Sequence, residues 1–306
     1  MRMSLKSKYL HSPLFDWVFL IGAPLLAYGI AYFVSLGLIP NPRIRVGSNT
    51  GLFWDLAVLI VFTQSHLFIV IIRAYLNPKI FNRYKKRLIL TPLILMSLLL
   101  SVDWILITVI VLNVFWDAYH SSLQTFGFAR IYDARIGTPR EQGRTQDFIL
   151  SLFIYMGPIF GGAVLMDHVQ SFQHFSKIGW YLLAGVPSIV DSHLVGIYVW
   201  VWGAGAAYGL YYLIWSWRQY RRGHAISIQK TALLIITAAV SLLAWGFNSF
   251  GMAFIITNFF HAWQYFAIVY ISERGNLAQC FGVAGSRYWR LWALVLLLGI
   301  GFGFGV

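Results

Sequence analysis

Negative charge is scarce in this chain, and charge of either sign is sparse. Asp and Glu number 10 among 306 residues against 23 Lys and Arg, and charged residues make up 11% of the sequence. Hydrophobic residues account for 59%, with a mean hydropathy of +0.69. Because soluble domains carry about 25% charged residues, this composition excludes a soluble globule and predicts a polytopic membrane protein.

Cysteine is almost absent as well. The single cysteine, Cys280, excludes an internal disulfide and a metal site built from several thiolates. A bound metal would therefore use histidine, carboxylate or amide ligands. The first apolar run, 14–39, lacks an obvious small-residue cleavage site and is too long for a signal-peptide core. We expect that run to be an uncleaved membrane span.

Apolar runs of about 20 residues, the length that crosses a bilayer as a helix, recur along the chain. They predict an all-α transmembrane helix bundle, one integral membrane domain over 1–306 with eight to nine spans. The run 88–100 is short, and it forms either a short span or half of a hairpin with the helix after Asp103. A tight turn is expected at 248–251. The expected spans are 14–39, 52–72, 88–100, 104–128, 147–166, 193–216, 230–249, 252–272 and 287–306.

The positions of Lys and Arg predict the orientation. With the N-terminus in the cytoplasm and 88–100 as a crossing, 20 of the 23 basic residues fall inside, and only Arg43, Arg45 and Lys177 fall outside. This division satisfies the positive-inside rule and favours nine crossings. The net charge of +13 then follows from topology and attraction to anionic lipid headgroups, so no nucleic-acid partner is expected. Compact loops and the lack of sorting signals favour a bacterial inner membrane.

Three of the expected spans carry one histidine each, with a polar residue three positions earlier. The pairs are Thr63/His66, Asp117/His120 and Asn258/His261. An ionisable side chain at membrane depth costs about 2.5 kcal/mol or more when it lacks a partner, and so indicates a functional site. A lone histidine in an apolar helix is more commonly a packing residue. Here, however, the charge count gives the three spans one direction and similar histidine depths, which predicts a shared site.

Two of the histidines belong to polar stripes at helical spacing. One stripe is Asp117, His120 and Gln124, and the other is Asn258, His261, Gln264 and Tyr265. Carboxylate or amide groups one turn from a histidine orient the imidazole or join it as ligands. The expected metal ligands are His66, Asp117, His120 and His261. The expected catalytic residues are Asp117, Tyr119 and Tyr265, with the tyrosines as proton donors, and the expected substrate contacts are Gln124, Asn258 and Gln264.

Imidazole and carboxylate ligands with open positions suit oxygen activation by non-haem iron, and a site within the bilayer admits lipophilic molecules from the side. The first hypothesis is therefore a metal-dependent membrane oxidoreductase of the oxygenase, hydroxylase or desaturase type, acting on a lipid, isoprenoid or carotenoid. Iron is favoured over copper or zinc, and a redox partner would approach from the cytoplasmic face. The HxxxH and HxxHH boxes of membrane desaturases are absent from the sequence, and no family is assigned.

Two other classes of protein could use the same residues. A transporter would employ Asp117, His120 and His261 as a substrate or proton site near mid-membrane, although the spans show no clear inverted repeat. A protein that holds haem through two histidines on different helices would be an electron carrier.

Other charged residues receive a structural interpretation. Asp133 and Glu273 follow the two stripes toward the cytoplasm, beside Arg130, Arg135 and Arg274. We expect salt bridges at the rim, with a role at an entrance to the site as the alternative. Five residues in or beside the external loop are expected to be solvated: Asp167, His168, His174, Asp191 and His193.

Overall fold

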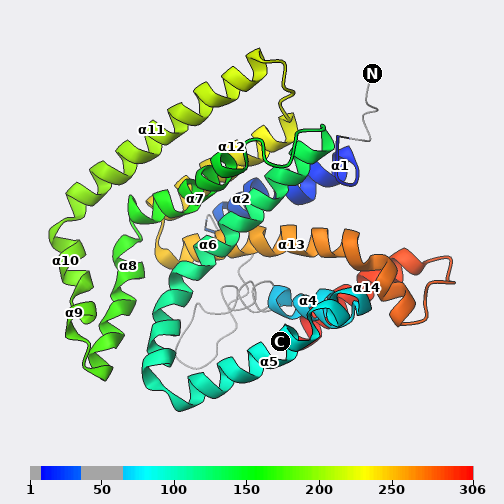
Figure 1. The fold of residues 1–306 in the computed structure, drawn as a ribbon, viewed down its shortest axis with the longest axis horizontal. Coiled ribbons are helices and arrows are strands. Elements are labelled where there is room, and N and C mark those ends of the chain that lie inside the picture. Colours follow the sequence, from blue (N-terminus) through cyan, green and yellow to red (C-terminus); the bar gives the residue numbers. More distant parts are fainter. Residues whose placement is uncertain (1–7, 36–64, 306) are drawn as a thin grey trace. The chain divides into compact units, whose positions relative to one another are not determined.

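The structure, a computed structural model, describes residues 8–35 and 65–305. Regular structure in these two ranges is helical throughout, without a β-strand (Figure 1), which confirms the all-α prediction there. Thr63 and most of the expected span 52–72 lie outside the described residues. The helices are α1 (Pro13–Phe15), η2 (Asp16–Ile21), α2 (Ala23–Ser35), α4 (Ser65–Ala74), α5 (Pro78–Ser101), α6 (Asp103–Arg135), α7 (Arg144–Phe160), α8 (Leu165–Gln170), η4 (Ser171–Ile178), α9 (Tyr181–Ala184), α10 (Val186–Ser192), α11 (Leu194–Arg221), α12 (Ile228–Phe247), α13 (Phe250–Cys280) and α14 (Trp289–Gly305).

Helix length and composition support a membrane protein. Four helices, α6, α11, α12 and α13, are long and apolar enough to cross a bilayer. Two bent helix pairs bring the candidate spans of the described ranges to as many as six, while α4 and α14 are shorter apolar helices. The expected run 88–100 is the second part of α5, a helix of 24 residues with non-helical backbone angles at Tyr84. The break expected at 248–251 is confirmed, because α12 ends at Phe247 and α13 begins at Phe250.

Internal contacts divide the chain into two compact units. The first unit is Met1–Leu25 with Leu99–Phe254, and the second unit is Leu26–Leu98 with Ile255–Val306. In the first unit α6 packs against α7 and α12, and α7 also packs against α11. Large buried side chains fill this unit, among them Tyr132 and Trp245. The expectation of a single membrane domain stays a prediction.

A sharp turn follows α7. The chain bends by 87° between α7 and the segment Leu165–Ile178. A Cβ on Gly162 would lie 2.6 Å from the Cα of Gly246 and 2.3 Å from the carbonyl oxygen of Pro158. The N–H of Ala163 donates to the carbonyl of Gly246 at 3.2 Å, which ties the turn to α12. The expected span 147–166 therefore contains a bend, because close backbone packing turns the chain inside the apolar run.

Four aromatic side chains on one side of α11 donate hydrogen bonds to α7 and to the turn after it. The bonds are Tyr198 Oη to Gly162 O (3.1 Å), Trp202 Nε1 to Gly161 O (2.9 Å), Tyr208 Oη to Gln146 O (3.0 Å) and Tyr212 Oη to Asp147 Oδ1 (2.7 Å). No residue of α11 is fully buried. Polar tips on aromatic side chains thus hold α11, an apolar and largely exposed helix, against α7.

The N-terminal segment is anchored by a buried carboxylate. Asp16 is fully buried. It accepts hydrogen bonds from the backbone N–H groups of residues 10–11 at 2.6 and 3.0 Å and from the Tyr132 hydroxyl at 3.1 Å. At Gly22 the chain bends by 56° between Pro13–Ile21 and Ala23–Phe33. The expected span 14–39 is accordingly bent within its described part.

In the second unit, α4, α13 and α14 share one apolar core. Its fully buried or nearly buried members are Ile69, Ile72, Phe266, Val269, Leu277, Ala293 and Leu297. Polar groups fix the segment after α4 to α13, because Asn276 Nδ2 donates to the Leu76 carbonyl at 2.9 Å. The face of α4 that carries Ile69 and Ile72 is therefore held against α13, and His66 lies on the same face one turn earlier.

Candidate metal centre

Two histidine rings meet in the second unit. His66 is the second residue of α4, and His261 lies within α13. The ring centroids are 5.2 Å apart, and the planes cross at 80°. Both side chains are removed from solvent, with 5% and 1% of their surface exposed. Two of the three histidines predicted to converge are therefore neighbours.

The polar stripe predicted on α13 lies on one continuous helix and faces inward. Asn258, His261 and Gln264 are buried, and Tyr265 is partly buried. The ring centroid of Tyr265 lies 6.1 Å from that of His66. A phenol, two amides and two imidazoles are thus gathered around α13 and the start of α4.

The spacing of the two imidazoles limits what they can bind. Imidazoles that coordinate one ion at about 2.1 Å with a tetrahedral angle between them have ring centroids roughly 5 Å apart, whereas ligands on opposite sides of an ion are more than about 6 Å apart. The measured 5.2 Å matches the first arrangement. The same distance also lies within the roughly 4.5–7 Å at which packed aromatic rings contact each other.

The second predicted stripe belongs to the first unit. Asp117, His120 and Gln124 lie on α6, each partly buried. The His120 ring stacks against that of Trp116, with centroids 6.4 Å apart, and Tyr119 contacts the same indole at 5.6 Å. The helical spacing of this stripe is confirmed. A common site with His66 and His261 stays a prediction from the sequence.

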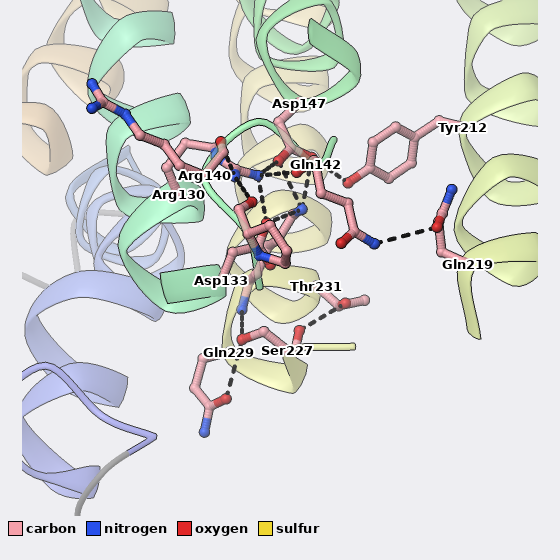
Figure 2. A network of polar contacts seen from close by, with 12 residues as sticks. Arg130, Asp133, Arg140, Gln142, Asp147, Tyr212, Gln219, Ser227, Gln229 and Thr231 are labelled. Atoms are coloured by element: carbon pink, nitrogen blue, oxygen red, sulfur yellow. Dashed lines mark hydrogen bonds and ion pairs between the residues drawn. The ribbon is translucent and has the colours of Figure 1, made fainter. Parts of the chain in front are cut away.

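A buried ion cluster in the first unit contains the predicted pair of Asp133 and Arg130 together with two residues that were not predicted, Asp147 and Lys230 (Figure 2). Arg130 Nη1 lies 2.7 Å from Asp133 and 2.8 Å from Asp147. Lys230 Nζ, from α12, lies 2.8 and 2.7 Å from the same two carboxylates. Tyr212 adds a hydrogen bond to Asp147 at 2.7 Å. The cluster joins α6, α7, α11 and α12.

Two positive and two negative charges make this ion cluster neutral. Asp147 is fully buried, and the side chains of Asp133 and Lys230 are 7% and 10% exposed. The Arg130 guanidinium also donates to the carbonyls of Arg140 and Gln142, at 2.9 and 3.0 Å. Burial of charge is tolerated only with pairing and hydrogen bonding of this kind. The cluster therefore fixes both the helices and the loop between α6 and α7.

The expectations for Asp133 and Glu273 need correction. The salt bridge of Asp133 to Arg130 is confirmed, but its position at a rim is wrong because the carboxylate is buried by α7 and α12. Glu273 is also buried, and it accepts a hydrogen bond from Asn77 Nδ2 at 2.9 Å.

His168 was expected in a solvated loop, but it is 1% exposed. Its Nδ1 lies 2.8 Å from the Val164 carbonyl, and the rings of Trp245 and Phe250 surround it at 5.3 and 5.0 Å. The remaining four residues of that group are exposed, as predicted: Asp167, His174, Asp191 and His193.

Comparison of the chain with models of protein families, with curated proteins and with solved structures gave no match. The functional proposal therefore rests on the geometry of the described residues and on the sequence.

Proposed function

We propose that this protein is a membrane-embedded, metal-dependent oxidoreductase that acts on a lipophilic substrate such as a lipid, isoprenoid or carotenoid. The observation that carries the proposal is the buried contact between His66 and His261. Two imidazoles on separate apolar helices, spaced as neighbouring ligands of one ion, have a ready use in metal binding. Iron is the favoured metal, because a mixed nitrogen and oxygen ligand set with open positions suits oxygen activation.

In this proposal His120 and Asp117 complete the ligand set from α6. This assignment rests on the sequence, because the count of Lys and Arg gives the span of Asp117 and His120 the same direction and depth as the spans of His66 and His261. Asn258 and Gln264 would orient the imidazoles or contact substrate, with Gln124 on α6 in the same role. Tyr265 is the better candidate than Tyr119 for a proton donor, because its ring contacts His66. Burial of α13 excludes water, and the metal would supply the redox chemistry.

The proposal includes nine crossings, a cytoplasmic N-terminus and a location in a bacterial inner membrane. The distribution of basic residues supports the orientation. The four to six candidate spans of the described ranges support membrane insertion. A site at this depth would receive its substrate from the bilayer and electrons from a partner at the cytoplasmic face.

Metal analysis of the detergent-purified protein tests the proposal. After anaerobic purification, the wild type is expected to contain about one transition-metal ion per chain and no Soret band. His261→Ala and His66→Ala should lose most of that metal, because each removes one of two adjacent ligands. His174→Ala, which changes an exposed histidine, should retain it. Wild-type protein without stoichiometric metal, or a His261→Ala variant that keeps it, would sink the proposal.

Two further measurements test the ligand set and the oxidoreductase activity separately. Retention of metal by His120→Ala, with loss in His261→Ala, would remove His120 from the ligand set while leaving the pair in place. Lipid extracts of cells that express the wild type should contain molecules that have gained oxygen or lost hydrogen, which are absent with His261→Ala. Bound metal without any such product would contradict the oxidoreductase but not the metal site.

A further inference from the structure

A groove of about 470 Å³ lies in the first unit between α7, α11 and α12. Its volume falls in the range of about 300–1,000 Å³ that is usual for sites of small molecules. Apolar side chains form most of the walls, among them Ile154, Leu213, Leu234 and Ile235. Leu213 and Ile235 are 67% and 63% exposed, so the groove is open along one side. Both α11 and α12 are candidate membrane spans, and the open side would face acyl chains.

One end of the groove is polar. Gln142 and Gln219 lie there, joined by a hydrogen bond of 3.3 Å from Nε2 to Oε1, together with His224 (Figure 2 shows the two glutamines). Asp133 and Lys230 of the ion cluster also line the groove. The groove therefore has apolar walls along most of its length and hydrogen-bonding groups at one end. Such a groove is complementary to an amphiphile, which has an apolar chain and a polar headgroup.

The charge around that end is positive. The flanking segments 136–144 and 218–224 contain five arginines against one glutamate, and that glutamate, Glu141, pairs with Arg144 at 3.7 Å. The two aspartates of the ion cluster are already neutralised by Arg130 and Lys230. Arg222, the exposed residue that follows the end of α11, stands three positions after Gln219, which lines the groove with Tyr212 and Trp215.

We propose that this groove binds an anionic phospholipid, with one acyl chain along α11 and α12 and the phosphate at the end that Gln142, Gln219, His224 and Arg222 surround. Charge complementarity selects the headgroup, because basic residues at the membrane surface attract anionic lipids. The apolar walls select a chain over a free phosphate. The site is independent of the histidines in the second unit.

Native mass spectrometry and thermal unfolding test this site. Full-length protein is purified in detergent, and phosphatidylglycerol, phosphatidylcholine or oleate is added. Phosphatidylglycerol should remain bound and raise the unfolding temperature, while phosphatidylcholine should bind more weakly. Arg222→Gln should weaken binding of phosphatidylglycerol about fivefold, which corresponds to about 1 kcal/mol for one basic residue near the surface. Ala238→Trp, which fills the apolar part, should abolish retention.

The matched control is Arg87→Gln on α5, an equal change of charge at an exposed arginine that should leave binding unchanged. Equal losses for Arg222→Gln and Arg87→Gln would show general attraction to basic surface and overturn the proposal. Equal stabilisation by phosphatidylcholine would contradict selection of an anionic headgroup. Binding of oleate without binding of phosphatidylglycerol would contradict a phospholipid ligand. Photocrosslinking uses the wild type and so tests the site even if Ala238→Trp fails to fold. A photoreactive phosphatidylglycerol should crosslink near Leu213 and Ile235. Crosslinks confined to other helices would contradict the site.

Discussion

At the scale of single residues, Asp147 has the most predictable energetic role. Its carboxylate is fully buried and contacts Arg130, Lys230 and Tyr212. Asp147→Asn leaves the buried Lys230 and the partly buried Arg130 with one carboxylate, and removal of one member of a buried ion pair costs about 3–5 kcal/mol. We expect a loss of about 3 kcal/mol in the free energy of unfolding, measured in mixed detergent micelles.

Glu141→Gln provides the control for this prediction. Glu141 is 77% exposed, and its ion pair with Arg144 spans 3.7 Å, so the change should alter the free energy of unfolding by less than about 1 kcal/mol. Adding Lys230→Met to Asp147→Asn should cost less than the sum of the single changes, because the double variant removes one charge of each sign. Equal effects of Asp147→Asn and Glu141→Gln would contradict a buried cluster.

Side chains with a helical spacing could be predicted from the sequence, whereas partners distant in the sequence could not. The stripe of Asn258, His261 and Gln264 was recognised because one helix brings its members together. Asp147 and Lys230 lie in the first turn of their helices. In the sequence, a charged residue at that position indicates only that a membrane span begins there. Only the packing of α7 against α12 reveals that they form an ion pair. His168 was misassigned for the same reason, since its aromatic neighbours come from other helices.

At the scale of helices and turns, Gly162 tests how the turn after α7 is held. A Cβ there would lie within 3.0 Å of three backbone atoms, on Pro158, Trp245 and Gly246. Backbone atoms cannot move aside like a flexible side chain, so Gly162→Ala should lower the free energy of unfolding by about 1–3 kcal/mol. Unfolding in mixed micelles measures this loss.

Gly157→Ala is the matched substitution. Gly157 lies in α7, and a Cβ there would meet no atom within 4 Å. Alanine should therefore be neutral or stabilise α7 by up to about 1 kcal/mol through its higher helix propensity. A Gly162→Ala variant as stable as Gly157→Ala would show that the turn has room to relax.

The long helices were predicted well because apolar length is a local property. The expected spans 193–216 and 230–249 correspond to α11 and α12, within a few residues at each end. The expected spans 104–128 and 252–272 end earlier than α6 and α13, because these helices continue through polar residues after the apolar run stops. The bends at Gly22 and after α7 were missed, since glycine alone does not indicate whether another backbone comes close.

At the scale of the whole molecule, the native cysteine provides a test of orientation. Cys280 is exposed at the end of α13, and the charge distribution predicts that this end is cytoplasmic. A membrane-impermeant maleimide should label Cys280 in inside-out vesicles and not in intact cells. Ser176→Cys in a Cys280→Ser background, near the externally predicted Lys177, should show the opposite pattern. Labelling of Cys280 in intact cells would reverse the orientation.

The class of molecule followed from composition, but its division into two units did not. Hydropathy counts apolar residues without stating which helices contact one another, so it could not indicate the two compact units. The single membrane domain expected over 1–306 stays a prediction. The contact of His66 with His261 could be predicted, because the count of Lys and Arg gave their spans the same direction. The groove and the ion cluster of the first unit required knowledge of which helix ends lie together.

The neutrality of the ion cluster has a consequence for the response of this protein to voltage. A membrane potential performs about 2.3 kcal/mol of work per elementary charge for each 100 mV, and it acts on net charge. Arg130, Lys230, Asp133 and Asp147 move as a group without net charge if α6, α7 and α12 shift together. A joint shift of these three helices would therefore produce no gating current from these four residues.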